Sequence, residues 1–210
     1  MRQRGSDPVV AIKICGLTTV EQALQCIDAG ADALGLNFWP ASSRRCEDPV
    51  AAQIVTAVGD RARIVAVVVN AAPERLRALR QLGLQWFQFH GAESGAQVAR
   101  WLPHAYKAIH LGGSAEPSPA SFPGDEILVD AKVDGLPGGT GVRCDWVAAE
   151  ALARRRKLWL AGGLDPDNVA SAIEVVRPYG VDVASGVESR PGVKDLKKVA
   201  RFIANARGAR

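Results

Sequence analysis

The chain has 210 residues, of which 48% are hydrophobic and 23% are charged, as in an ordinary globular protein with one sizeable core. The net charge is only +4, and no basic stripe is interleaved with aromatic residues, so a nucleic-acid partner is not expected. No run reaches the ~20 apolar residues of a membrane span. Residues 1–8 lack an apolar signal segment, so the expected location is cytoplasmic.

The four cysteines are Cys15, Cys26, Cys46 and Cys144, and they have neither CxxC spacing nor a neighbouring histidine. A zinc site or a disulfide framework is therefore not expected. We interpret Cys26 and Cys46 as small apolar residues of the core, which is the usual role of a buried cysteine.

Eight short apolar runs recur along the chain, and most of them end in Gly, Asn, His or Asp. Runs of this length, bounded by turn residues, are typical of strands buried on both faces of a parallel sheet. The runs are residues 9–15, 31–38, 62–70, 84–90, 105–111, 126–131, 157–163 and 181–186.

Helical signals stand between several of these runs. One helix is predicted from Thr18 or Thr19 to Gly30, and a second from Pro73 to Gly83. Asp165 is predicted to cap a third helix with Pro166 in its first turn, and Asp195 to open the terminal helix. Residues 112–125 hold three prolines and no helical period, so we expect an irregular connection after the fifth strand.

Eight strands, each followed by a crossover, predict an α/β fold, a single (β/α)8 barrel over residues 9–210. Residues 1–8 are expected to be a disordered N-terminal extension. The alternative is a doubly wound sheet, which usually has five or six strands and carries GxGxxG after the first strand when it binds dinucleotides. The first run here ends in KICGLT instead.

The active site of a (β/α)8 barrel lies at the carboxyl ends of its strands. The side chains expected there are polar: Cys15, Asn37, Asn70, His90, His110 and Asp130. Glycine-rich turns at 161–164 and 184–188 follow the last two strands, where this fold commonly binds phosphate through backbone amides. They could also be ordinary connections. A third glycine-rich segment, residues 135–141, is expected to act as a lid or to add a phosphate contact.

Several motifs together resemble one enzyme family over residues 10–206: KICGLT, FWPASSRR, FQFHG, VDAKVDGLPGGTG with DW, AGGLDPDNVASAI and VDVASGVESRPGVKD. The resemblance is to phosphoribosylanthranilate isomerase of tryptophan biosynthesis. It implies an Amadori rearrangement of a phosphorylated aminosugar by general acid and base catalysis. The chemistry needs neither a cofactor nor a metal. From the composition we expect no nucleic-acid or membrane partner, and the oligomeric state is left open between a monomer and a homodimer.

The resemblance assigns roles to individual residues. Cys15 matches the general base and Asp130 the general acid. Arg44 matches the arginine that faces the anthranilate carboxylate, with the adjacent Arg45 as its competitor. From the spacing alone, Lys13 lies on the same strand face as Cys15, and we expect it to lower the pKa of the thiol.

The resemblance also implies a lining for the rest of the pocket. His90 is expected at its wall, and Gly162, Gly163, Ser185 and Gly186 around the phosphate. Asp182 lies on the eighth strand, beside the first in a closed barrel, and either pairs with Lys13 or contacts the substrate. One departure concerns residues 142–144, Val-Arg-Cys, where the family often has lysine and a small polar residue; Arg143 is the candidate replacement.

Three other functions are weighed. Indole-3-glycerol-phosphate synthase is a barrel of similar kind, but it uses a lysine acid where this chain has Asp130. An isomerase that also accepts a second aminoaldose would need more anion contacts, for which Arg44, Arg45 and Arg143 are the obvious candidates. A non-catalytic phosphate sensor would need neither Cys15 nor Asp130.

Overall fold

The computed structural model describes residues 10–111, 118–130 and 143–209, with side chains omitted at 143–145. The expected disorder of residues 1–8, the segment 135–141 and the side chain of Arg143 therefore lie outside the described part of the chain. Among the described residues, no helix is both long enough and apolar enough to cross a lipid bilayer.

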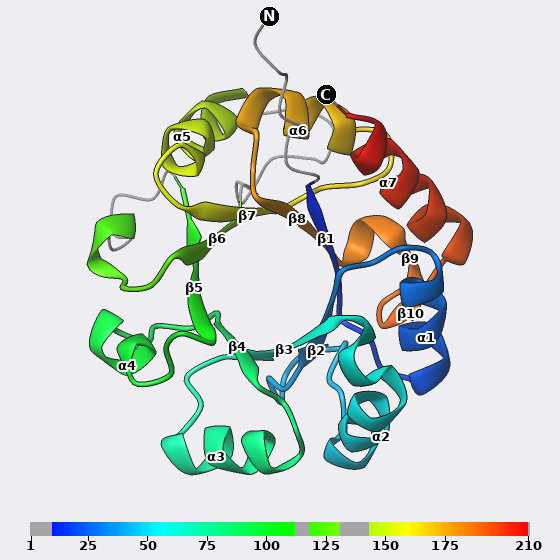
Figure 1. Ribbon diagram of the computed structural model, residues 1–210, viewed down its shortest axis with the longest axis vertical. Helices are drawn as coiled ribbons and strands as arrows, with labels where there is room; N and C mark the ends of the chain where they lie inside the picture. The colour runs from blue at the N-terminus through cyan, green and yellow to red at the C-terminus, as the bar shows by residue number, and fades with distance from the viewer. Residues whose placement is uncertain (1–9, 112–117, 131–142, 210) are drawn as a thin grey trace, which may run out of the picture.

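Eight parallel strands close into a barrel in chain order, as Figure 1 shows in a view along the barrel axis. Seven of the predicted apolar runs contain one strand each, and the eighth run, residues 181–186, overlaps β8, which begins at Gly180; the predicted (β/α)8 fold is confirmed. The strands are β1 Ala11–Cys15, β2 Ala33–Asn37, β3 Arg63–Val68, β4 Trp86–Phe89, β5 Ala105–His110, β6 Glu126–Asp130, β7 Lys157–Ala161 and β8 Gly180–Val183.

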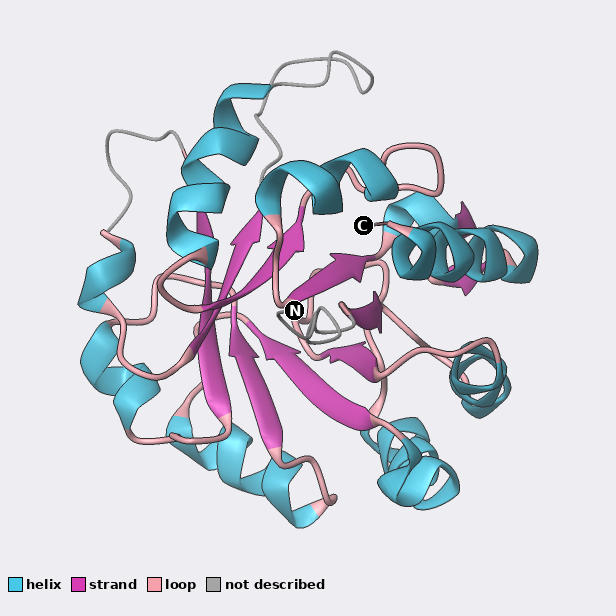
Figure 2. Ribbon diagram, turned by 45° about the horizontal axis from the view of Figure 1, so that its top comes forward, coloured by secondary structure: helices cyan, strands magenta, loops and turns pink. Residues whose placement is uncertain are grey.

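Helices surround this barrel on the outside (Figure 2). They are α1 Val20–Asp28, α2 Asp48–Val58, α3 Pro73–Gln81, α4 Gly95–Ala99, α5 Arg143–Ala153, α6 Val169–Val176 and α7 Leu196–Gly208. Helices α2, α4 and α5 were not predicted individually. Three-residue 3-10 turns, η1 Gly59–Arg61, η2 Pro119–Ser121 and η3 Ser185–Val187, and an unpredicted hairpin of β9 Glu188–Arg190 and β10 Val193–Lys194 complete the described elements.

The predicted helix starts can be checked by their caps. The hydroxyl of Thr19, not that of Thr18, accepts the backbone N–H of Gln22 at 3.2 Å and begins α1. Asp195 caps α7 by accepting two backbone N–H groups at 2.9 and 3.2 Å. Asp165 also accepts two backbone N–H groups, at 2.7 and 3.0 Å, but these belong to the turn before α6.

The connection after β5 is irregular in the part that the structure describes. Of residues 112–125, only 118–125 are described, and they contain just the short turn η2. The prediction of an irregular connection therefore agrees with residues 118–125 and stays a prediction for the others.

The alternation of strand side chains divides the apolar residues between two cores. Outward-facing residues such as Ile12 and Ile14 pack under the helices in the larger core. A smaller core fills the barrel interior and includes Val65, Leu128 and Trp159. Since the interior is packed at this level, open space for a ligand is left at the carboxyl ends of the strands.

The opposite, amino-terminal end of the barrel is closed by a polar cluster. Nη1 of Arg63 donates to both carboxylate oxygens of Glu126 at 3.0 and 2.8 Å, and Nε1 of Trp159 donates to Glu126 at 2.8 Å. The guanidinium of Arg63 also stacks on the ring of Trp86, 3.8 Å from its centroid. We call Arg63, Trp86, Glu126 and Trp159 the floor cluster.

We expect Glu126→Ala to lower the free energy of unfolding by about 2–4 kcal/mol, because it leaves the indole N–H of Trp159 and the guanidinium of Arg63 without their acceptor. Glu126→Gln keeps an acceptor for both donors and should lose less. Denaturant unfolding of the two variants measures the difference. Equal stability of Glu126→Ala and the wild type would contradict this role of the floor cluster.

Candidate active site

A cavity of about 230 Å³ opens at the carboxyl ends of the strands. Every predicted site residue except Gly186 lines it: Cys15, Arg44, His90, Asp130, Gly162, Gly163, Asp182 and Ser185. Asn37 lines it too, whereas Asn70 and His110, the other candidates at strand ends, are not among its lining residues. The prediction that the strand ends converge on one pocket therefore holds for the residues that line the cavity and not for Asn70, His110 or Gly186, and the roles of the residues remain to be tested.

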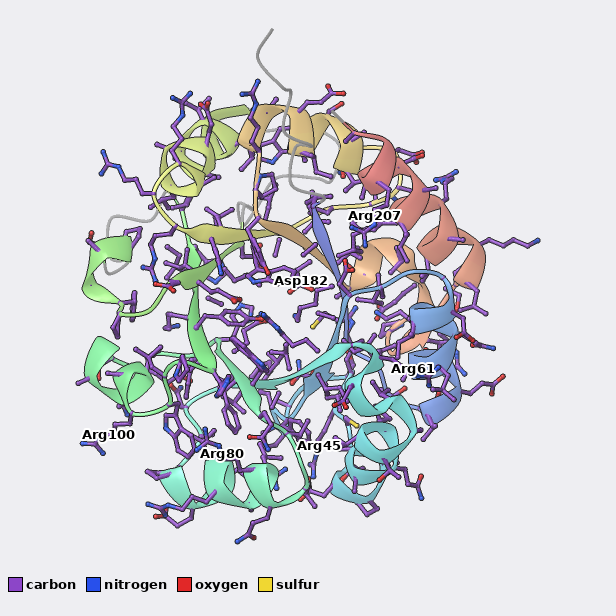
Figure 3. The ribbon with its side chains drawn as sticks, viewed as in Figure 1. Arg45, Arg61, Arg80, Arg100, Asp182 and Arg207 are labelled. Carbon is purple, nitrogen blue, oxygen red and sulfur yellow. The ribbon has the colours of Figure 1, made fainter. Side chains whose placement is uncertain are left out.

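A larger groove of about 800 Å³ lies outside the barrel between α3 and α4. Figure 3 shows Arg80 and Arg100, two of its lining residues, at the periphery, whereas Asp182 points into the barrel. The residues that the sequence singles out for chemistry do not meet in this groove. We therefore place the candidate site in the smaller cavity.

Lys13 and Asp182 form the buried centre of the site. They are register partners on β1 and β8, and Nζ of Lys13 lies 2.7 Å from Oδ2 of Asp182, which confirms the predicted pairing. Burial by itself would lower the pKa of Lys13, but Asp182 and the thiol of Cys15 raise it overall, so Lys13 is charged. Oδ1 of Asp182 is buried without a hydrogen-bond partner among the described residues, and its contact with substrate stays a prediction.

Cys15 is half-buried at the end of β1, beside Gly35 of β2 in the strand register. A Cβ atom at position 35 would lie 2.6 Å from Sγ of Cys15, so only glycine leaves room for the thiol. Burial raises the pKa of the Cys15 thiol, and Lys13 opposes this effect without overcoming it. Lys13 thus acts on the thiol pKa in the expected direction, but the net pKa is raised because desolvation of the thiolate outweighs the nearby cation.

Asp130 ends β6 and is half-buried at the cavity wall. Its register partners are His110 on β5 and Ala161 on β7. His90 follows β4, and its ring centroid lies 6.0 Å from that of His110. Burial lowers the pKa of His90, so its imidazole is neutral at neutral pH.

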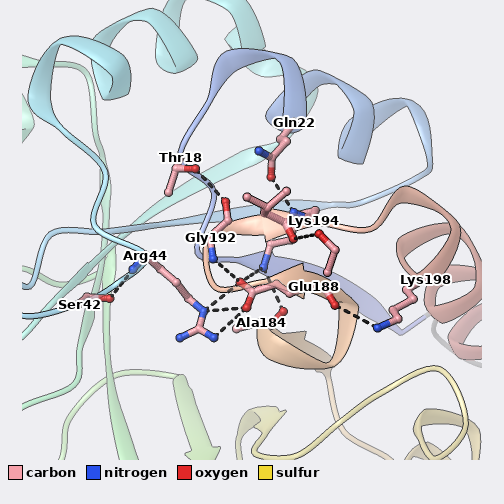
Figure 4. A network of polar contacts seen from close by, with 11 residues as sticks. Thr18, Gln22, Ser42, Arg44, Ala184, Glu188, Gly192, Lys194 and Lys198 are labelled. Carbon is pink, nitrogen blue, oxygen red and sulfur yellow. Dashed lines mark hydrogen bonds and ion pairs between the residues drawn. The ribbon is translucent and has the colours of Figure 1, made fainter.

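Arg44 is held in place by a buried carboxylate that the sequence did not reveal. Its Nε and Nη2 donate to Glu188 at distances of 2.7–3.1 Å, and Lys194 donates to the same carboxylate at 2.9 Å (Figure 4). Burial opposes ionisation of Glu188, but its hydrogen bonds with Arg44 and Lys194 lower its pKa overall. The carboxylate therefore stays charged and fixes the plane of the guanidinium.

Two further contacts distinguish Arg44 from Arg45. Gly16 has a φ of +82°, and a Cβ there would lie 2.8 Å from Cδ of Arg44, so the arginine stem packs directly on the glycine of KICGLT. Arg45 pairs instead with the exposed Glu47 at 3.1 Å. Only Arg44 lines the cavity, which favours it as the carboxylate ligand.

The two glycine-rich turns lie against each other. Gly162 and Gly163 have φ values of +89° and +67°, in the left-handed region that favours glycine. A Cβ at Gly186 would lie 2.0 Å from the carbonyl oxygen of Leu164. Gly186 thus packs the second turn onto the first and does not line the cavity, so its predicted phosphate contact stays a prediction.

Two polar side chains that line the cavity, those of Gln88 and Ser42, were missed from the sequence. Gln88 stands two residues before His90 on the same face of its strand, and that spacing was the available signal. Ser42 accepts the backbone N–H of Arg44 at 3.1 Å and shapes the loop that carries this arginine.

A closed (β/α)8 barrel with ionisable groups and glycine-rich turns at the carboxyl ends of its strands defines a barrel enzyme of the acid–base type. The family model described as N-(5'-phosphoribosyl)anthranilate (PRA) isomerase matches residues 12–205. The chain belongs to the N-(5'-phosphoribosyl)anthranilate isomerase family, and it is an isomerase.

Individual relatives cover almost the whole chain. The N-(5'-phosphoribosyl)anthranilate isomerase of Magnetococcus marinus is 44% identical over 203 residues, which are 95% of this chain and 96% of that protein. The crystal structure of the Thermotoga maritima isomerase has a TM-score of 0.84 at 38% identity and covers 95% of this chain and 99% of its own. A second isomerase structure, in complex with reduced 1-(o-carboxyphenylamino)-1-deoxyribulose 5-phosphate, has a TM-score of 0.81 at 35% identity, with coverage of 95% and 99%.

The raised pKa of Cys15 predicts how the thiol reacts with iodoacetamide. Only the thiolate reacts, so the rate of alkylation at Cys15 should keep rising as the pH passes the ordinary thiol value of 9.0. Cys26 and Cys46 are buried, which raises their pKa values to about 11 and about 12, and they should stay unmodified in the folded protein. Mass spectrometry of the peptides measures each rate, and a Cys15 rate that levels off below pH 8 would contradict the prediction.

Proposed function

We propose that this chain converts N-(5-phospho-β-D-ribosyl)anthranilate to 1-(2-carboxyphenylamino)-1-deoxy-D-ribulose 5-phosphate, an Amadori rearrangement of L-tryptophan biosynthesis. The observation that carries the proposal is that Cys15, Asp130, Arg44 and the turn at 162–163 line one cavity in a member of this isomerase family. Binding of the reduced product analogue by the relative with 35% identity supports the same substrate class. The proposed location is cytoplasmic, and the proposed state is a monomer or a homodimer.

Two proton transfers by the protein lead to an enolamine, and a tautomerisation that places a proton on C1′ and removes the C2′ hydroxyl proton completes the reaction. Asp130 donates a proton to the furanose ring oxygen, the bond from that oxygen to C1′ breaks, and the amine nitrogen lone pair forms a Schiff base. Cys15 then removes the proton from C2′, and the electron pair left behind moves into the iminium to give an enolamine. The enolamine tautomerises to the ketone. Since the iminium is the electron sink, the chemistry requires no cofactor.

The neighbours of Cys15 support its role as the base. Lys13 is a buried cation on the same strand face, and it favours the thiolate against the effect of burial. Only a minor fraction of Cys15 is thiolate at neutral pH, because the pKa of the thiol is raised. The proposal therefore implies that kcat/KM increases with pH through the neutral range, as the fraction of thiolate at Cys15 increases.

Two anion contacts orient the substrate between these groups. Arg44 binds the anthranilate carboxylate, with its guanidinium plane fixed by Glu188. The ribose 5-phosphate binds at the turns that contain Gly162, Gly163 and Ser185, where backbone amides come close to an oxyanion. One anionic group on either side of the sugar leaves a single productive orientation in the cavity.

The direct test is to add the purified protein to chemically generated phosphoribosylanthranilate and to follow its fluorescence. We expect a decrease with turnover. If circular dichroism shows that the protein is folded and the fluorescence does not decrease, the proposed function is refuted.

We expect Asp130→Asn and Cys15→Ser each to lose on the order of 10²–10⁴ in kcat, the usual effect of removing a positioned proton-transfer group. Both variants should fold and bind the reduced product analogue, because neither change removes an anion contact. The pH profile should lose the limb of the Cys15 thiol in Cys15→Ser and keep it in Asp130→Asn. A Cys15→Ala variant with near-normal turnover would show that another residue is the base.

We expect Arg44→Ala to lose a charge-assisted contact of about 1.5–3 kcal/mol, or roughly ten- to a hundredfold in kcat/KM. Arg45→Ala is the matched control and should change kcat/KM by much less, because Arg45 pairs with the exposed Glu47 outside the cavity. Thermal unfolding of both variants separates a binding defect from the loss of the Arg44–Glu188 pair. The reverse order of the two kinetic effects would overturn the choice of Arg44.

A further inference from the structure

Gln88 lies inside the barrel, where only 2% of it is exposed, and its amide contacts three polar side chains. Nζ of Lys13 and the hydroxyl of Tyr106 donate to Oε1 of Gln88 at 3.0 and 3.2 Å. On the other side of the amide, Nε2 lies 3.2 Å from Nδ1 of His90. The amide of Gln88 thus joins the buried ion pair to a ring that lines the cavity.

The contact with Lys13 decides which way the amide faces. An ammonium group has only donors, and Lys13 is charged because it pairs with Asp182 at 2.7 Å. The reversed amide would place its NH2 group against the ammonium, so that two buried donors would face each other. The carbonyl oxygen of Gln88 therefore faces Lys13, and its NH2 group faces His90.

This orientation fixes the proton on His90. The NH2 group of Gln88 can only donate, so Nδ1 of His90 accepts and carries no proton. Burial lowers the pKa of His90, and His110 and Lys107 on β5 and Lys13 on β1 act in the same direction, while Asp130 on β6 opposes them. A neutral imidazole has one N–H group, which must then be on Nε2.

We propose that Gln88 is a positioning residue that holds His90 as the neutral tautomer with its proton on Nε2, so that His90 donates a hydrogen bond to an oxygen atom of the bound sugar. The tautomer follows from the contacts of Gln88 in the free protein, and only the identity of the hydrogen-bond acceptor rests on the proposed function. Because the lone pair of Nδ1 is taken by Gln88, His90 does not compete with Cys15 as a base. Because the ring is neutral, it also adds no charge beside Asp130.

The tautomer can be observed directly by NMR of protein labelled with ¹⁵N-histidine. Correlations between the ring nitrogens and the carbon-bound ring protons distinguish the Nε2–H, Nδ1–H and doubly protonated forms. The chain has three histidines, His90, His104 and His110, so the variants His104→Gln and His110→Gln assign the signals. We expect the Nε2–H pattern for His90 at pH 7–8, with a titration midpoint below the ordinary value of 6.5.

Gln88→Glu tests the role of the amide. A carboxylate has only acceptors, so the oxygen beside Nδ1 of His90 requires a proton there. We expect His90 to change to the Nδ1–H or the doubly protonated pattern, with its midpoint raised by about one to three pH units. Tyr106→Phe is the matched control, because it removes one donor to Oε1 but keeps Lys13, and His90 should retain the Nε2–H pattern.

The outcomes separate this inference from the proposed function. An Nδ1–H pattern in the wild type, or an unchanged pattern in Gln88→Glu, would overturn the inference. Should Gln88→Glu not fold, the wild-type pattern and that of Tyr106→Phe decide the matter. Addition of the reduced product analogue should shift the His90 Nε2 signal. An Nε2–H tautomer in a protein that binds no analogue would count against the proposed function alone.

Discussion

The buried pair of Lys13 and Asp182 is the constraint on which the site depends. A charged amine without exposure to solvent must have acceptors around it, and two strands at opposite ends of the chain, β1 and β8, supply the amine and its carboxylate 169 positions apart. The pair therefore spans the seam at which the barrel closes. From the same amine, polar contacts extend to the thiol of Cys15 and to the amide of Gln88. Closure of the fold and the electrostatics of the cavity thus share one interaction.

The barrel could be predicted because its strands are continuous apolar runs and most of its connections carry local signals. Asp195 caps α7 with its own side chain, a contact between residues close in sequence. Three helices gave weaker signals. Helix α2 has no side-chain cap hydrogen bond, α4 has only five residues, and α5 follows the glycine-rich segment. The hairpin of β9 and β10 has a local turn signal in Pro191-Gly192, with a φ of +78° at Gly192, but no local signal indicates that Glu188 pairs with Arg44, 144 residues away.

Most of the site could be predicted from the residues at the carboxyl ends of the strands, because a parallel barrel places all of these ends on the same side. Cys15, Asp130 and His90 could be placed there from sequence pattern and resemblance. The direction of the pKa shift at Cys15 could not be predicted, because burial raises the pKa while the charge of Lys13 lowers it. Gly186 was predicted as a ligand residue, but the structure shows that glycine is required there because the carbonyl oxygen of Leu164 leaves no room for a side chain. The amide of Gln88 acquires a direction only when Lys13 and Tyr106 are beside it.

In the described part of the chain, the floor cluster closes the end of the barrel opposite the cavity. Among the described residues, Arg63, Trp86, Glu126 and Trp159 occupy the amino-terminal end, and the apolar interior core separates the charged pair of Arg63 and Glu126 from the cavity. A molecule bound in the cavity is therefore exchanged at the carboxyl ends of the strands, the end away from the floor cluster. Release of one occupant and arrival of the next are then mutually exclusive events. Product that accumulates in solution is therefore expected to compete with substrate for the same cavity.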